Sequence, residues 1–130
     1  MHDRAEGVHK PLLATMVWLE TMSAASGPPL VIVSLDHCIL DGREIEAMRE
    51  AVARAVGIDA SSALVTVSHT HGSGWMSRER SHLPGGDLIG PYLDGLRETV
   101  AAMAVEARAS IAPATVVYGQ GRCALAAHRD

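Results

Sequence analysis

Phenylalanine is absent from this chain, and aromatic residues make up only 3% of it. Valine, leucine, isoleucine, methionine and alanine must therefore fill the core, and aromatic platforms on which nucleic-acid bases could stack are not expected. Positive charge is also scarce, because 11 Lys and Arg stand against 15 Asp and Glu, for a net charge of -4. Without an electrostatic attraction to phosphates, we expect no nucleic-acid partner.

Cysteines and long apolar runs are similarly few. Cys38 and Cys123 are far apart and follow no metal-binding or redox spacing, so we interpret them as buried thiols. No run of about 18 apolar residues is present, which predicts no transmembrane segment. The N-terminus, "MHDRAEGVHKP", is charged and lacks the apolar stretch of a signal peptide. As written, the chain is expected to be soluble, untargeted and cytoplasmic.

The residues that are present predict a single α/β unit spanning residues 1–130, because 48% of them are apolar and 20% charged. Apolar and β-branched runs predict four strands, at residues 12–20, 30–36, 63–68 and 114–121. The second and third strands are nearly continuous apolar runs, which is typical of strands covered on both faces.

Two helices are expected between these strands. Asp41 and Glu44 form a capping-box pattern at the start of the first, and Gly57 stands where a C-cap glycine belongs. Pro91 suits the first residue of the second helix, which should end near Ser110. The order β-β-α-β-α-β predicts a mainly parallel sheet with helices packed on both faces, and ligands bind beyond the carboxyl ends of such strands.

The segment "VTVSHTHGSGW", residues 65–75, carries two histidines at the end of the third strand, His69 and His71. Residues i and i+2 of a strand point to one face, so both imidazoles are expected to reach one ligand. Imidazole is a common zinc ligand, and a catalytic zinc usually has three protein ligands and an open position. The alternative interpretation is that both are ordinary polar residues at a strand end.

Other polar residues could complete such a site. Asp36, after the second strand, either orients a ligating imidazole or bonds nearby backbone amides. Gly72 and Gly74 either admit a substrate close to the backbone or only permit a turn. Ser73 has no Ser-His-Asp partner set and is not expected to be a nucleophile. Further residues with two open interpretations, as site members or as ordinary loop residues, are His37, His82, His128, Arg78, Arg80 and Trp75.

Several segments together resemble the N-terminal catalytic domain of the neutral/alkaline, non-lysosomal ceramidase family. They are "GVHKPLLATMVWLE", "LVIVSLD", "REAVARAVGIDASSALVTVSHTH" and "VVYGQGRCALAAHR", which follow the family's order and spacing over nearly all of the chain. The most specific part is "SHTHGSG", which is similar to the family's Thr-His-Thr-His-Ser-Gly-Pro signature.

The resemblance implies a zinc-dependent hydrolase of linear amide bonds, which releases a fatty acid and a sphingoid base from ceramide-like substrates. It implies that His69 is a zinc ligand and that His71 faces the scissile amide and its developing oxyanion. Gly72 and Ser73 then belong to the substrate-binding loop. Zn²⁺ is the implied cofactor, and the implied substrate is a small amide or a lipid-like molecule.

The chain departs from the family at two places, because Gly72-Ser73-Gly74 replaces Ser-Gly-Pro and His128-Arg129-Asp130 stands where many members have an Asn-Arg pair. The resemblance also implies further zinc ligands (a His, a Glu and a Tyr) from segments beyond this length. We therefore expect an internal fragment of a longer enzyme, without amidase activity by itself. Two alternatives stay open: a non-catalytic ligand-binding module or inactive fragment, and a same-fold hydrolase of another amide or ester.

Overall fold

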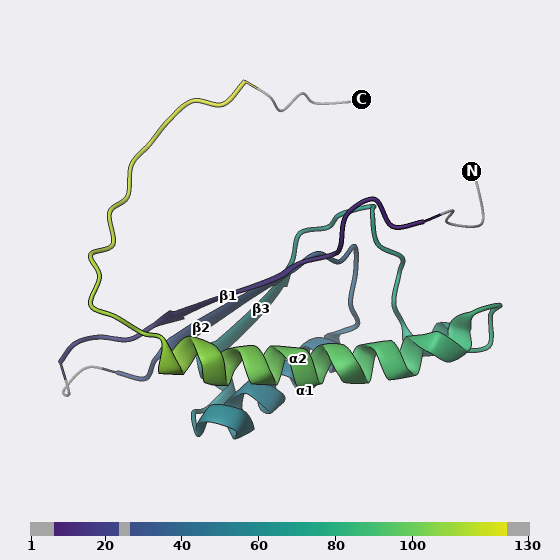
Figure 1. The fold of residues 1–130 in the computed structure, drawn as a ribbon, viewed down its shortest axis with the longest axis horizontal. Helices are drawn as coiled ribbons and strands as arrows, with labels where there is room; N and C mark the ends of the chain where they lie inside the picture. The colour runs from purple at the N-terminus through teal and green to yellow at the C-terminus, as the bar shows by residue number, and fades with distance from the viewer. Residues whose placement is uncertain (1–6, 24–26, 125–130) are drawn as a thin grey trace.

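The structure is a computed structural model in which residues 7–23 and 27–124 are described. It is a small mixed α/β fold with a three-stranded sheet in the order β1-β2-β3 and two helices (Figure 1). The strands are β1 (Ala14–Leu19), β2 (Leu30–Leu35) and β3 (Ala63–Val67), and the helices are α1 (Gly42–Val56) and α2 (Ile89–Ala109). These five elements match the predicted segments to within two residues at each end.

The sheet is mixed, and the predicted mainly parallel sheet is not present in the described residues. β1 pairs antiparallel with β2, with Val17 opposite Ile32, while β2 pairs parallel with β3, with Ile32 opposite Leu64. The connection between β1 and β2 is short and contains no helix among its described residues, and a short link favours an antiparallel neighbour. The α1 crossover between β2 and β3 allows the parallel pairing.

The prediction of a fourth strand at residues 114–121, which the structure describes, is wrong. Residues 114–121 form no ladder, and Val116, Val117 and Tyr118 are 80%, 85% and 93% exposed. The segment leaves the end of α2 and runs past the sheet without joining it (Figure 1). A β-branched run has strand propensity, but propensity becomes a strand only where packing and pairing support it.

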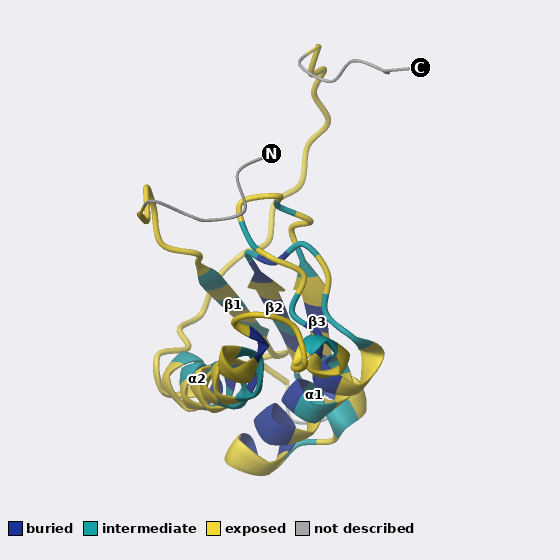
Figure 2. Ribbon diagram, turned by 90° about the vertical axis from the view of Figure 1, so that its right-hand side faces the viewer, coloured by how far each residue is buried: buried dark blue, intermediate teal, exposed yellow. Residues whose placement is uncertain are grey.

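The core lies between one face of the sheet and the two helices. Alternate residues of β2, namely Val31, Val33 and Leu35, are at most 1% exposed because they face α1 and α2. Figure 2 shows both helices on the same side of the strands. The opposite face is uncovered among the described residues, so the prediction of helices on both faces is wrong. The buried cluster comprises Val31, Val33, Leu35, Met48, Val52, Val56, Ala63, Val65, Val100 and Ala104.

The ends of α1 agree only in part with the predicted capping. Gly57 adopts a left-handed conformation (φ 68°) and its N–H donates to Ala53 O at 2.8 Å, as expected of a C-cap glycine. The capping box at the other end is not formed. Asp41 makes no side-chain cap hydrogen bond, and Glu44 Oε1 accepts instead from Arg78 Nε at 2.7 Å. A charged partner outside the helix gives the Glu44 carboxylate a stronger bond than the backbone N–H would.

α2 begins at Ile89, two residues before the predicted first residue Pro91, and it ends at Ala109, next to the predicted end near Ser110. A short 3-10 turn at Gly86–Leu88 leads directly into it. No helix in the described parts of the chain is long and apolar enough to cross a membrane.

Candidate metal centre

The polar residues that follow β2 and β3 meet at one edge of the sheet. The two strands are parallel, so their carboxyl ends lie side by side and the segments that leave them are neighbours. Ser68 Oγ donates to Asp36 Oδ1 at 3.1 Å, and Ser68 N donates to Leu35 O at 2.9 Å. Ser68, which directly precedes His69, is therefore hydrogen-bonded to the end of β2.

Asp36 also forms hydrogen bonds with Leu13, the residue just before β1. Leu13 N donates to Asp36 Oδ2 at 3.0 Å, and Asp36 N donates to Leu13 O at 2.8 Å. Each carboxylate oxygen of Asp36 thus accepts one hydrogen bond, Oδ2 from Leu13 and Oδ1 from Ser68. This agrees with the interpretation of Asp36 as a strand-end residue that bonds nearby groups. Among the described residues, no hydrogen bond joins Asp36 to a histidine.

His69 and His71 do come together, but not through strand alternation. β3 ends at Val67, so both histidines lie in the loop that follows. His69 has a φ of 56°, the only left-handed backbone among the non-glycine residues described. This turn directs the two rings toward each other, with centroids 5.4 Å apart and planes inclined by 66°. A left-handed residue other than glycine costs about 1–2 kcal/mol, and such costs concentrate at functional sites.

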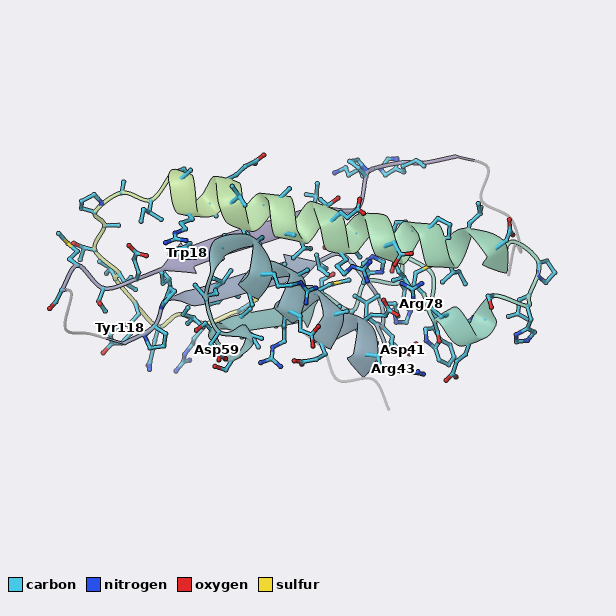
Figure 3. All side chains as sticks on the ribbon, turned by 90° about the horizontal axis from the view of Figure 1, so that it is seen from below. Trp18, Asp41, Arg43, Asp59, Arg78 and Tyr118 are labelled. Carbon is cyan, nitrogen blue, oxygen red and sulfur yellow. The ribbon has the colours of Figure 1, made fainter. Side chains whose placement is uncertain are left out.

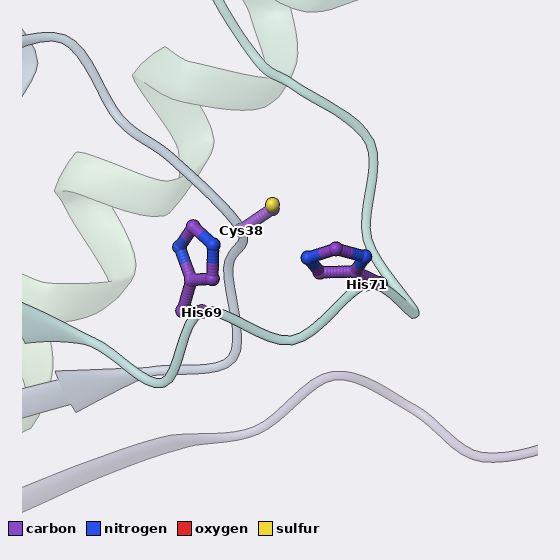
Figure 4. A group of neighbouring side chains, drawn as sticks. All are labelled: Cys38, His69 and His71. Atoms are coloured by element: carbon purple, nitrogen blue, oxygen red, sulfur yellow. The ribbon is translucent and has the colours of Figure 1, made fainter. Parts of the chain in front are cut away.

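Cys38 is the third member of the cluster, which sequence reasoning missed. The potential ligand atoms of Cys38, His69 and His71 all lie within 4.8 Å of one another (Figure 4). The interpretation of both cysteines as buried thiols is wrong, because Cys38 is only half-buried and Cys123 is exposed. No local spacing signals this role, since Cys38 and the histidines are far apart in sequence. The available signal was its position just beyond the end of β2.

The donor set fits a borderline or soft divalent metal. One thiol and two imidazoles are ligands that zinc prefers, whereas calcium and magnesium prefer oxygen. A tetrahedral zinc with ordinary bond lengths separates its nitrogen and sulfur ligands by about 3.3–3.6 Å. The three donors would therefore approach one another slightly on binding, which the exposed side chains of His69 and His71 permit.

Comparison of the chain with protein-family models, curated proteins and solved structures finds no match.

The loop after His71 closes over the end of the Cys38 segment. Cys38 N donates to Ser73 Oγ at 2.8 Å, and Gly72 N donates to Thr70 Oγ1 at 3.2 Å. Farther along, Leu40 and Met76 form an isolated parallel bridge. The loop that carries both histidines is thus joined at two points to the segment that carries Cys38.

The other histidines named from the sequence lie apart from this cluster. His37 is buried, its Nε2 lies 2.7 Å from Tyr92 Oη, and its Nδ1 has no hydrogen-bond partner in the described chain. Burial lowers the pKa of His37, opposed by the negative charge of Asp36, so the neutral ring is favoured. His82 Nδ1 lies 2.8 Å from Glu79 O. His128 falls outside the described residues.

The two arginines of the glycine-rich loop, Arg78 and Arg80, both contact partners within the chain. Arg78 binds Glu44 of α1 and, through its Nη2, Asp94 Oδ1 of α2 at 2.7 Å. Figure 3 labels Arg78 in the region between the two helices. The guanidinium of Arg80 lies over the Trp75 ring, 4.9 Å from its centroid. Trp75 and Arg80 line a shallow hollow of about 430 Å³ beside the cluster's loop. Trp75 therefore lines this hollow and also stacks with the Arg80 guanidinium.

A larger hollow, of about 490 Å³, lies at the opposite end of the sheet. Trp18, Leu19, Leu30 and Ile111 are among the residues that line it, and they come from β1, the start of β2 and the segment after α2. Cys38, His69 and His71 do not line it, so this hollow is separate from the candidate metal centre.

Proposed function

We propose that this chain carries part of the metal site of a zinc-dependent hydrolase of linear amide bonds, similar to the neutral ceramidases. The observation that supports this most directly is the convergence of Cys38, His69 and His71 within 4.8 Å at the carboxyl edge of parallel strands. Such edges are where α/β folds bind ligands. The activity is proposed for the full-length protein rather than for residues 1–130.

His69 is the proposed zinc ligand. Zinc, when bound, polarises the amide carbonyl and lowers the pKa of a coordinated water. The hydrogen bonds from Ser68 to Asp36 and Leu35 fix the residue before His69, so its left-handed backbone is held by the strand ends. A ligand held in this way loses little further freedom on binding metal.

His71 is the proposed substrate-facing group. Its ring lies beside that of His69, so an imidazole N–H there can donate to the oxygen that gains negative charge as the amide is attacked. Gly72 and Ser73 follow directly and form the adjoining wall for the substrate. The substrate class is a small-molecule amide, including lipid-like N-acyl amides.

Metal analysis of the purified full-length protein tests the role of His69. We expect one zinc per chain in the wild type and loss of that zinc in His69→Ala. His82→Ala is the matched control, because His82 is a histidine of the same loop region whose ring lies outside the cluster. Stoichiometric zinc in His69→Ala would refute the proposal.

Hydrolysis assays with N-acyl sphingoid bases, simple N-acyl amides and carboxylic esters test the activity. We expect turnover of an amide by the full-length protein and its loss in His71→Ala, with zinc retained. A non-catalytic metal-binding module is the second candidate, which the exposure of both histidines favours. Bound zinc with no turnover of any tested amide or ester would establish that alternative instead.

A further inference from the structure

We infer that the thiolate of Cys38 is a ligand of the same metal ion as His69. This inference rests on the proposed metal site and deepens it, because it adds a sulfur ligand from a different strand end. The first ground is distance: the Cys38 sulfur lies within 4.8 Å of a ring nitrogen of each clustered histidine. Figure 4 shows Cys38 on its own segment, facing the loop of His69 and His71.

The second ground is that the backbone holds Cys38 in place. Its N–H donates to Ser73 Oγ at 2.8 Å, and the Leu40–Met76 bridge joins the same two segments farther along. The sulfur therefore stays near the histidines without any covalent link, and little chain entropy is lost when a metal joins them. Preorganisation of this kind raises affinity by lowering the ordering cost.

The third ground is the surroundings of the thiol. Cys38 is only half-buried and forms no disulfide, and the other cysteine, Cys123, is exposed and lies after α2. The residues on either side of Cys38 along the chain contact other groups: Asp36 accepts from Leu13 and Ser68, and His37 is buried with its Nε2 against Tyr92. Cys38 is thus the nearest soft donor left to face the two imidazoles.

A sulfur ligand changes the expected chemistry of the site. With Cys38 and His69 as ligands and His71 facing the substrate, this chain supplies one sulfur and one nitrogen donor to a zinc site, which usually has three protein ligands and an open position. Sulfur ligation favours zinc, cobalt or other thiophilic ions over magnesium and calcium. The thiol loses its proton when it binds the metal.

Cobalt(II) substitution of the full-length protein provides the first test. We expect a thiolate-to-cobalt charge-transfer band in the near-ultraviolet, which imidazole and carboxylate ligands do not produce. Cys38→Ser should lose this band, while the matched control Cys123→Ser keeps it. Zinc affinity of Cys38→Ser should fall more than about tenfold, since loss of even an outer-shell partner costs 10–100-fold.

Alkylation of the wild-type protein provides a second test that needs no variant. Zinc should protect Cys38 from iodoacetamide, measured peptide by peptide, and should leave the labelling of Cys123 unchanged. Equal labelling of Cys38 with and without zinc would overturn the inference.

The two proposals fail in different ways. If His69→Ala loses zinc while Cys38→Ser keeps full affinity and no thiolate band appears, Cys38 is not a ligand but the His69 proposal stands. If His69→Ala keeps its zinc, the proposed function fails whatever the result for Cys38.

Discussion

The backbone N–H of Cys38 donates a 2.8 Å hydrogen bond to the side-chain oxygen of Ser73, across the junction between the two segments that leave β2 and β3. This bond joins the sulfur-bearing segment to the loop of both histidines. A single hydroxyl thereby links the stability of this sheet edge to the geometry of the candidate metal centre.

The first prediction follows from that bond. Ser73→Ala leaves the Cys38 N–H without its partner, so we expect the free energy of unfolding to fall by about 1 kcal/mol. Zinc affinity, measured by competition with a chromophoric chelator, should fall as well. Ser81→Ala is the control, because its hydroxyl makes no hydrogen bond within the described part of the chain. Equal stability of Ser73→Ala and wild type would contradict this account.

A second prediction concerns the left-handed backbone of His69. In the metal-free protein His69→Gly should raise the free energy of unfolding by about 1 kcal/mol, because glycine adopts this conformation without steric cost. The same substitution should remove zinc. His71→Gly should instead lower stability by about 0.4–1 kcal/mol, since it only adds freedom to the unfolded chain. Chemical denaturation in chelator measures both, and destabilisation by His69→Gly would argue against stored strain.

A third prediction compares two arginines. Arg78→Met leaves the buried Glu44 carboxylate without its partner, which should cost about 2 kcal/mol of stability. Arg43→Met removes an exposed pair with Glu79 and should change stability by less than about 0.5 kcal/mol. Urea denaturation of both variants measures the difference, and similar small effects would show that the Arg78 pair contributes little.

The same network predicts a pH dependence. The hydrogen bond from Arg78 lowers the pKa of Asp94 from its ordinary value of 3.8. A depressed carboxyl pKa contributes stability that is present above 3.8 and is lost as the pH falls through the folded-state pKa. The stability difference between wild type and Asp94→Asn should therefore shrink in acid. Denaturation curves at neutral pH and below 3.8 test this, and a constant difference would count against it.

A fifth prediction uses two glycines. A Cβ on Gly86 would lie 2.3 Å from Arg80 O, a backbone contact that cannot relax by rotating a side chain. Gly86→Ala should therefore destabilise the protein by about 1–3 kcal/mol. Gly95 lies within α2 with open space around it, so Gly95→Ala should stabilise by about 1 kcal/mol. Thermal unfolding compares them, and a neutral Gly86→Ala would refute the close approach.

Local patterns in the sequence predicted the elements well. Strand and helix ranges, the Gly57 cap and the polar strand ends all follow from periodicity and propensity over short windows. The same patterns gave wrong predictions where the structure depends on a partner from a distant segment. Residues 114–121 have strand composition but pair with nothing described, and Glu44 bonds to Arg78 rather than capping its own helix.

The candidate site divides in the same way. Its two histidines were visible as a spaced pair at a strand end, and their position beyond β3 was predicted. Cys38 was not, because a cysteine far away in sequence carries no local signal of what it will face.

By itself, then, the sequence determined the ranges of β1, β2, β3 and both helices, and it placed polar groups where β2 and β3 end. Tertiary structure decided the mixed strand directions, the uncovered sheet face and the meeting of Cys38 with His69 and His71. The physical reason is the distance along the chain between the residues that interact. Propensity and periodicity act between near neighbours in the chain, whereas strand pairing and metal-ligand clusters depend on contacts between segments that only the packed fold brings together.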